Sequence, residues 1–286
     1  MKYRLMVSLV GIPGLLLLIW LGGWPYFALI TVVTLIGIHE YLKMLRAENL
    51  ATRDIPLYLA AMAILILAAQ GSGSLTSSWV PGFDSGVILL TVILVLTLQT
   101  WDVLKSPDRS WLGMGAHLVG FIWIAGFMSS FLIIRQLTNI SGYQTNVDIG
   151  FRLTLALFVS VWVCDSAAYF FGKAFGKTKI APQVSPNKTV LGTAAGLLAA
   201  ILTMQLFALR AWLPGFNVAD YLVLGVITGA FGQLGDLAES RLKRDMGVKD
   251  SSNFLPGHGG ILDRFDSLLY VMPITAMYIR LVLQRG

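Results

Sequence analysis

The chain has 286 residues, of which 56% are hydrophobic and only 13% are charged. Soluble domains carry about 25% charged residues, so the composition excludes an ordinary soluble enzyme and indicates a polytopic helical membrane protein. The apolar runs are long and continuous, whereas a transmembrane barrel would show short alternating segments. The net charge of +6 is concentrated in particular loops, which does not indicate a nucleic-acid partner. The single cysteine, Cys164, excludes an internal disulfide.

Nine apolar segments are candidates for membrane-spanning helices. The third and fourth are shorter than the roughly 20 residues that cross a bilayer upright. The first resembles a signal peptide, but no small-residue cleavage site follows it, so we interpret it as a span. The nine segments cover residues 5–21, 24–42, 56–69, 86–101, 111–134, 151–171, 190–213, 221–237 and 265–283.

Lysine and arginine occupy alternate loops between these segments, and the other loops are only edged by Arg135, Arg152 and Arg210. By the positive-inside rule, this predicts an all-α polytopic membrane protein with about nine transmembrane helices, its N-terminus in the cytoplasm and its C-terminus outside. We divide it into N-terminal membrane helices (residues 1–150) and C-terminal membrane helices that carry the polar motifs (residues 151–286). The cationic residues on the predicted cytoplasmic side are Lys2, Arg4, Lys43, Arg46, Arg53, Lys105, Arg109, Lys173, Lys177, Lys179, Lys188, Arg241, Lys243, Arg244, Lys249 and Arg264.

The most polar stretch of the chain lies between the last two apolar segments. Charged groups beside lipid are costly unless they pair with each other, with a metal or with a charged ligand. Asp236 and Glu239 end one segment, and Asp263 and Asp266 begin the next, so we expect these four carboxylates to converge at one cytoplasmic level. Asp165 lies about two turns above the cytoplasmic end of its own segment.

Helical spacing places Asp236, Ser240 and Lys243 on one face, and Asp263 and Asp266 on another. Facing carboxylates suit Mg²⁺, which prefers oxygen ligands and commonly bridges one or two carboxylates to substrate phosphates. Asp236 and Asp263 are therefore the predicted metal ligands. The alternative is that these groups only cap helix ends, with Asp236 paired to Lys243 and Asp263 stabilising a helix N-terminus.

Two loops are candidates for phosphate binding. Residues 255–260 are rich in glycine, which lets backbone amides approach an anion beside a helix N-terminus. His258 in this loop is a candidate acid or base, phosphate donor or structural hydrogen-bonding group. Residues 173–189 contain prolines and glycine, which predict an ordered turn instead of a helix, and this loop could equally contact anionic lipid. Two acidic residues near the cytoplasmic ends of apolar segments, Glu40 and Asp102, are interpreted as helix caps.

The run from Ser240 through residues 255–260 to Asp266 closely resembles the signature of phosphatidate cytidylyltransferases, also called CDP-diacylglycerol synthases. Residues 164–172 and 185–192 resemble the same family, and the motif-bearing resemblance covers roughly residues 160–275. One departure is Leu191, where this family usually carries Glu or Gln.

The resemblance implies Mg²⁺-dependent transfer of CMP from CTP to phosphatidate, with room for a second cation, monovalent or divalent. It also implies a homodimer in the lipid bilayer of the bacterial inner (cytoplasmic) membrane, with the active site toward the cytoplasm. The implied catalytic residues are Asp236, Asp263, Asp266 and Lys243, with Asp236 and Asp263 on the metal. The implied substrate-binding residues are Asp165, Ser166, Ser185, Lys188, Ser240, Arg244, Lys249, Asp250, His258 and Arg264.

Two alternatives stay open at this point. An enzyme that uses CTP on another lipid, such as a polyprenol kinase or an archaeal-lipid cytidylyltransferase, would share much of this chemistry. A transporter could instead use the carboxylates as an ion path. Transporters usually place such groups near the membrane midplane between broken helices, whereas here the polar groups gather at one face.

Overall fold

A computed structural model of the protein describes residues 2–48, 50, 54–70, 90–100, 110–138, 146–252, 254 and 259–283. These residues form helices almost throughout, with one two-stranded antiparallel hairpin. The N-terminal half contains α1 (Lys2–Leu21), α2 (Gly23–Ala47), α3 (Asp54–Ala69), the helix Leu90–Thr100, α5 (Ser110–Gly120), η1 (Phe121–Gly126) and α6 (Phe127–Arg135). The C-terminal half contains α7 (Ile149–Phe175), β1 (Lys179–Ala181), β2 (Ser185–Thr189), α8 (Val190–Leu209), α9 (Val218–Val226), η2 (Ile227–Phe231), α10 (Gly232–Asp245), α11 (Leu262–Tyr278) and η3 (Ile279–Leu283).

Each of the nine predicted apolar segments coincides with a helix in the described part of the chain. Six helices there are long and apolar enough to cross a membrane, and three shorter apolar helices accompany them. The helical membrane architecture is therefore confirmed, while nine crossings and the sides on which the termini lie stay predictions. The six long helices are Gly23–Ala47, Leu112–Arg135, Ile149–Phe175, Val190–Leu209, Val218–Asp245 and Leu262–Leu283.

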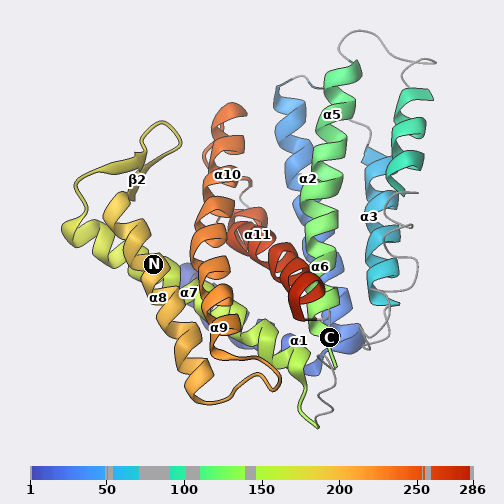
Figure 1. The fold of residues 1–286 in the computed structure, drawn as a ribbon. Coiled ribbons are helices and arrows are strands. Elements are labelled where there is room, and N and C mark those ends of the chain that lie inside the picture. The colour runs from blue at the N-terminus through green and yellow to red at the C-terminus, as the bar shows by residue number, and fades with distance from the viewer. Residues whose placement is uncertain are drawn as a thin grey trace.

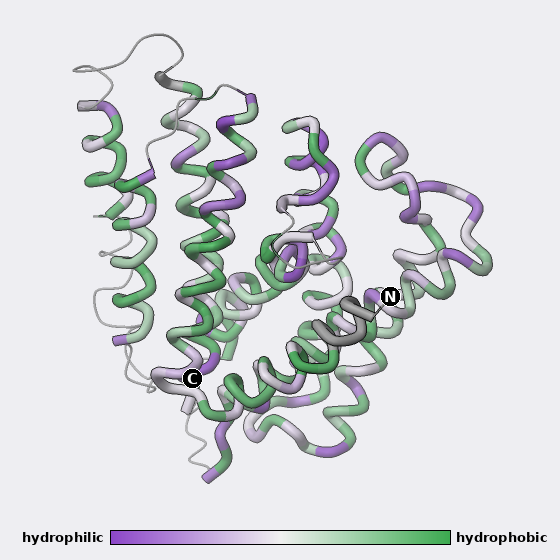
Figure 2. Tube along the Cα trace, turned by 180° about the vertical axis from the view of Figure 1, so that it is seen from behind, coloured by the Kyte–Doolittle hydropathy of each residue, from purple (hydrophilic) through white to green (hydrophobic). Residues whose placement is uncertain are grey.

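The helices form two groups with α11 between them (Figure 1). Helices α2, α3 and α5 stand side by side in one group, and α7 and α8 lie in the other, with the hairpin at their end. Helix α11 packs against both α10 and α6. Hydrophilic residues gather at the hairpin and at the end of α10 (Figure 2). The helix surfaces elsewhere expose many large apolar side chains, such as Leu59, Leu202 and Leu206, as expected of surfaces that face lipid.

Two helices extend further than their apolar runs. Helix α7 continues to Phe175 and α10 to Asp245, so Lys173 and Lys243 lie on helices and not in the loops that follow. The added residues include alanine, leucine, glutamate, lysine and arginine, which favour helix, so the end of hydrophobicity is not the end of the helix. Gly247, with φ of 65°, adopts the left-handed conformation that terminates the second extension.

Close helix packing sets the position of the hairpin. A Cβ atom on Gly192 of α8 would lie 2.6 Å from the carbonyl oxygen of Ala168 and 2.9 Å from the Cα of Gly172, so only glycine permits this approach of α7 and α8. Thr189, the last residue of β2, accepts a hydrogen bond from the Gly192 amide and caps α8. The predicted ordered turn is confirmed as this hairpin, which is anchored directly on the α7–α8 crossing.

Candidate active site

A cavity of about 1340 Å³ lies between α7, the hairpin, α10, α11 and the first two helices. One wall is polar and carries acidic and basic side chains from the C-terminal half. Another part of the lining is apolar and is formed largely by α1 and α2, including Val10, Leu15, Leu18, Leu29 and Val33. A single cavity thus joins a highly charged surface to a surface suited to hydrocarbon.

Three carboxylates from three helices face one another in this cavity: Asp165 of α7, Asp236 of α10 and Asp266 of α11. We call them the carboxylate cluster. Each lies within electrostatic range of the other two, and Lys188 of β2 acts on all three. The Lys188 Nζ atom lies 2.6 Å from Asp236 Oδ2, and both side chains stay partly exposed, at 24% and 30%. Their exposure leaves these charges accessible to a ligand.

The backbone explains why these side chains meet. A Cβ atom on Gly235 would lie 2.5 Å from the Asp266 carbonyl oxygen, so glycine lets α10 approach α11 next to Asp236. One turn earlier, the Gln233 amide nitrogen donates to the carbonyl oxygens of Thr193 and Gly229, at 3.0 and 2.7 Å. Gly229 lies in η2, and π-helical turns free backbone groups for such contacts. This buried glutamine therefore ties α10 to α8 beneath the cavity.

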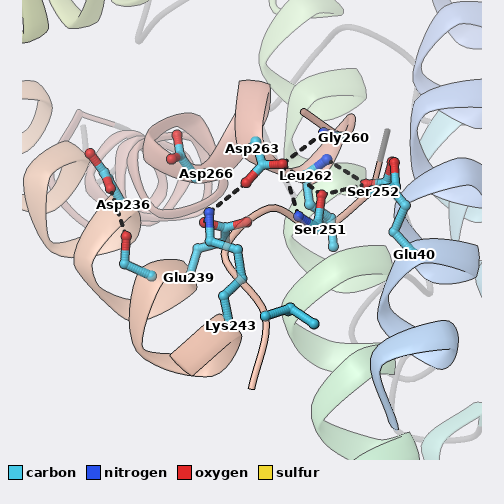
Figure 3. A network of polar contacts seen from close by, with 12 residues as sticks. Glu40, Asp236, Glu239, Lys243, Ser251, Ser252, Gly260, Leu262, Asp263 and Asp266 are labelled. Carbon is cyan, nitrogen blue, oxygen red and sulfur yellow. Dashed lines mark hydrogen bonds and ion pairs between the residues drawn. The ribbon is translucent and has the colours of Figure 1, made fainter. Parts of the chain in front are cut away.

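A second charged group lies beside the carboxylate cluster (Figure 3). Lys243 contacts Glu239 one turn before it on α10, and its Nζ lies 2.5 Å from Asp263 Oδ1 at the start of α11. Glu239 is fully buried, and the side chains of Lys243 and Asp263 are 10% and 8% exposed. The alternative pairing predicted from spacing, Asp236 with Lys243, is wrong, because Asp236 pairs with Lys188 and Lys243 with these two partners.

The other oxygen of Asp263 is also engaged. Asp263 Oδ2 accepts hydrogen bonds from the backbone amides of Ser251 and Gly260, at 3.0 and 2.7 Å, and lies 2.9 Å from the Ser251 hydroxyl. A Cβ atom on Gly259 would lie 2.6 Å from this oxygen, and the φ of Gly259 is 78°. Gly259 therefore makes room for Asp263, and the Gly260 amide donates to that carboxylate in this structure.

Eight of the predicted site residues line the cavity and are brought together by the fold. Asp250 and Arg264 join the two charged groups there, both exposed. The eight residues are Asp165, Lys188, Asp236, Lys243, Asp250, Asp263, Arg264 and Asp266.

Five predicted residues lie off the cavity lining. The Ser166 hydroxyl donates to the Trp162 carbonyl of its own helix, and Ser240 donates to Asp236 Oδ1 at 3.3 Å. Arg244 donates to the carbonyl oxygens of Val184 in the hairpin and Val248, so it fastens the hairpin to the end of α10. Its phosphate contact stays a prediction. The five residues are Ser166, Ser185, Ser240, Arg244 and Lys249.

Two predicted residues, His258 and Asp102, lie outside the described residues. Leu191, at which the family resemblance is broken, is exposed in the first turn of α8 and is not part of the cavity lining. The apolar residue at this position therefore removes no contact inside the cavity.

Several lining residues were not among the predicted site residues. Lys173 and Lys179 belong to the basic segment 173–189 that sequence analysis had identified, so the segment was recognised but not its full set of lining side chains. Gln233 gave no signal beyond being polar in an apolar segment. Glu40 of α2 was interpreted as a helix cap, and the helix that it caps is α11, because it accepts bonds from the Ile261 and Leu262 amides.

The residues present can be tested against the implied Mg²⁺. Within the described residues, no three histidine, cysteine or acidic side chains lie close enough to hold a metal ion by themselves. Mg²⁺ does not require such a set, because it commonly takes one or two carboxylates and completes its shell with water and substrate phosphates. The carboxylate cluster, with three acidic groups facing one lysine, offers that kind of oxygen donor and fits the ion.

Comparison with known proteins agrees with this chemistry. Residues 2–282 match the model of a family described as the cytidylyltransferase family. A phosphatidate cytidylyltransferase of Bacillus subtilis is 35% identical over 278 residues, which cover 96% of this chain and 95% of that protein. Proteins of the same name from Staphylococcus saprophyticus and Staphylococcus epidermidis are 35% and 34% identical, over 96% of this chain and 97% of each relative. The chain therefore belongs to the cytidylyltransferase family.

Proposed function

We propose that this chain transfers CMP from CTP to phosphatidate and so forms CDP-diacylglycerol and pyrophosphate. The relatives named above carry the name of this activity across almost the whole chain. The structural observation that supports the proposal best is the two-sided cavity. Its charged wall suits a triphosphate and a lipid phosphate, and its apolar wall, between α1, α2 and α7, suits acyl chains.

The reaction joins two anions, and this is its main obstacle. A phosphate oxygen of phosphatidate attacks the α-phosphorus of CTP, the bond from the α-phosphorus to the bridging oxygen breaks, and pyrophosphate leaves with the electron pair. The bond that forms links the lipid phosphate to CMP. Groups that neutralise both partners and hold them in line supply most of the acceleration in such transfers.

The cations on the cavity wall can perform that neutralisation. Lys188 is partly exposed and lies at the mouth of the carboxylate cluster, so it can exchange its contact with Asp236 for a substrate phosphate. Lys173, Lys179 and Arg264 line the same cavity. Lys243 is more deeply buried between Glu239 and Asp263, so it sets the charge at the cavity floor.

A bound Mg²⁺ would supply further neutralisation of the phosphates and orient them for displacement. Asp236 and Asp266 would hold it, because both belong to the carboxylate cluster. Asp263, the second ligand predicted from the sequence, is engaged by Lys243, Ser251 and Gly260 in this structure. Asp263 would have to give up one of these contacts to hold the ion together with Asp236 and Asp266. A second cation, monovalent or divalent, is an open part of the proposal.

We further propose an inner-membrane location, with the cavity toward the cytoplasm and two copies in the assembly. The cytoplasmic placement is supported by the lysines and arginines that surround the hairpin and the end of α10. The homodimer is supported by the family resemblance alone.

A panel of acceptors tests the proposal. Purified protein is supplied with CTP and with phosphatidate, a polyprenol or an archaeal-type ether lipid, each with Mg²⁺ and with a chelator. We expect pyrophosphate release with phosphatidate and Mg²⁺ only. Turnover confined to the polyprenol or the ether lipid would support one of the other CTP-using enzymes. Absence of turnover with every lipid would contradict the proposal and leave transport as the alternative.

A further inference from the structure

A buried carboxylate from the N-terminal half reaches the signature region. Glu40 lies near the end of α2 and is 1% exposed. It is not part of the cavity lining, so it does not face a substrate. All motifs that point to the activity lie beyond residue 160, which makes a contact from α2 unexpected.

Four donors converge on this carboxylate (Figure 3). Glu40 Oε1 accepts from the Ser252 hydroxyl at 2.5 Å and from the Ile261 amide at 2.9 Å. Glu40 Oε2 accepts from the Ser251 hydroxyl at 3.0 Å and from the Leu262 amide at 2.9 Å. The two amides belong to the N-terminus of α11, where a negative charge is favoured by the helix dipole.

These donors stand at both ends of one loop. Ser251 and Ser252 precede the glycine-rich loop, and Ile261 and Leu262 follow it, so Glu40 closes the loop at its base. A Cβ atom on Gly260 would collide with the Ser251 hydroxyl and would lie only 2.5 and 2.6 Å from the two Glu40 oxygens. The glycine therefore makes room for this closure.

The hydrogen bonds of Glu40 also connect it to the charged side chains of the cavity. The Ser251 hydroxyl lies 3.0 Å from Glu40 Oε2 and 2.9 Å from Asp263 Oδ2, and its single proton is shared between the two acceptors. Asp263 in turn holds Lys243, and Asp266 follows it by one helical turn. Glu40 is thus connected, through Ser251 and through the start of α11, to the carboxylate cluster and to the group formed by Lys243, Glu239 and Asp263.

We propose that Glu40 is a positioning residue for the reaction: it holds both ends of the glycine-rich loop and sets the start of α11, so that Asp263 and Asp266 face the cavity. This inference rests on the proposed function. It assigns to the N-terminal helices a part in arranging the site, in addition to their apolar wall.

The test compares Glu40→Gln with Asp220→Asn in the full-length protein. A glutamine at 40 keeps the volume but turns a donor toward the Ile261 or the Leu262 amide and removes the charge. Asp220 is a matched control, because it is also a buried carboxylate at a helix start, bonded by the Asn217 amide and the Tyr278 hydroxyl, and remote from the cavity lining.

We expect kcat per folded molecule to fall by roughly ten- to a hundredfold in Glu40→Gln. The KM for CTP should change little, because Glu40 does not face the cavity. Hydrogen exchange at the amides of residues 260–262 should accelerate in this variant and not in Asp220→Asn, which should keep its kcat. A residue that only stabilises the fold would lower the yield of folded protein and leave kcat and this local exchange unchanged.

The double variant Glu40→Gln, Ser251→Ala tests whether Glu40 acts through Ser251. If Glu40 acts through Ser251, the two losses should be less than multiplicative, because one contact is removed by either change. Wild-type protein is assayed in parallel: inactivity of the wild type with CTP and phosphatidate would contradict the proposed function itself. An active wild type together with an unchanged kcat in folded Glu40→Gln would overturn the inference about Glu40.

Discussion

Replacement of Lys188 by alanine separates a substrate-binding role from mere contact with anionic lipid. The Lys188–Asp236 pair is partly solvated, at 24% and 30% exposure, so its loss should cost at most about 1 kcal/mol of stability. A charge-assisted contact with a substrate phosphate contributes roughly 1.5–3 kcal/mol, which corresponds to about ten- to a hundredfold in kcat/KM. A lysine that faces only lipid headgroups contributes about 1 kcal/mol of membrane attraction, shared with its neighbours.

The matched control is Lys177→Ala, in the same basic segment. Lys177 is exposed and lies off the cavity lining, whereas Lys188 lies on it. Both variants are assayed with CTP and phosphatidate in one detergent, at equal amounts of folded protein. We expect a loss of at least about tenfold in kcat/KM for Lys188→Ala and little change for the control. Equal, small losses in both variants would refute the reasoning and remove Lys188 from the site.

Three further predictions follow from the same geometry. Asp236→Asn should abolish turnover without loss of folded protein, and substantial activity in the folded variant would remove this carboxylate from the essential set. Gly260→Ala should lower activity by tenfold or more, because its Cβ collides with the Ser251 hydroxyl; wild-type kinetics would show that the loop can shift freely. In a Cys164→Ser background, an impermeant thiol reagent applied to intact cells should label Gly286→Cys and not Lys249→Cys, and the reverse pattern would overturn the predicted orientation.

The class of fold was predictable because it depends on composition and on long apolar runs. Segment ends were less predictable, because α7 and α10 continue past their apolar residues through good helix formers. This matters for the site, since Lys173, which was assigned to the loop, lies on the last turn of α7. The hydrophobic pattern located these two helices, but their last turns depended on helix propensity.

The residues that line the cavity were largely predictable, but their partners were not. Spacing along one helix suggested Asp236 with Lys243, whereas packing between elements pairs Asp236 with Lys188 of the hairpin. That contact depends on the close approach of α7 to α8 and of α10 to α11, which a single sequence does not specify. Glu40 could not be predicted for the same reason: its partners are more than 200 residues away along the chain.

The reasoning about glycine was only partly right. Residues 255–260 were predicted to present backbone amides to phosphate, but the amide of Gly260 donates to Asp263. Residues 255–258 lie outside the described residues, so for them this stays a prediction. The glycines at 259 and 260 are needed for the approach of protein carboxylates.

The central claim is that the α-phosphate of CTP, with its nucleoside, is transferred to phosphatidate. The most direct test supplies the purified protein, in separate reactions, with CTP labelled at the α- or at the γ-phosphate. The account predicts that the α-label enters the lipid fraction as CDP-diacylglycerol and that the γ-label is released as pyrophosphate in equal amount. Entry of the γ-label into the lipid would show phosphoryl transfer by a lipid kinase and would contradict the account.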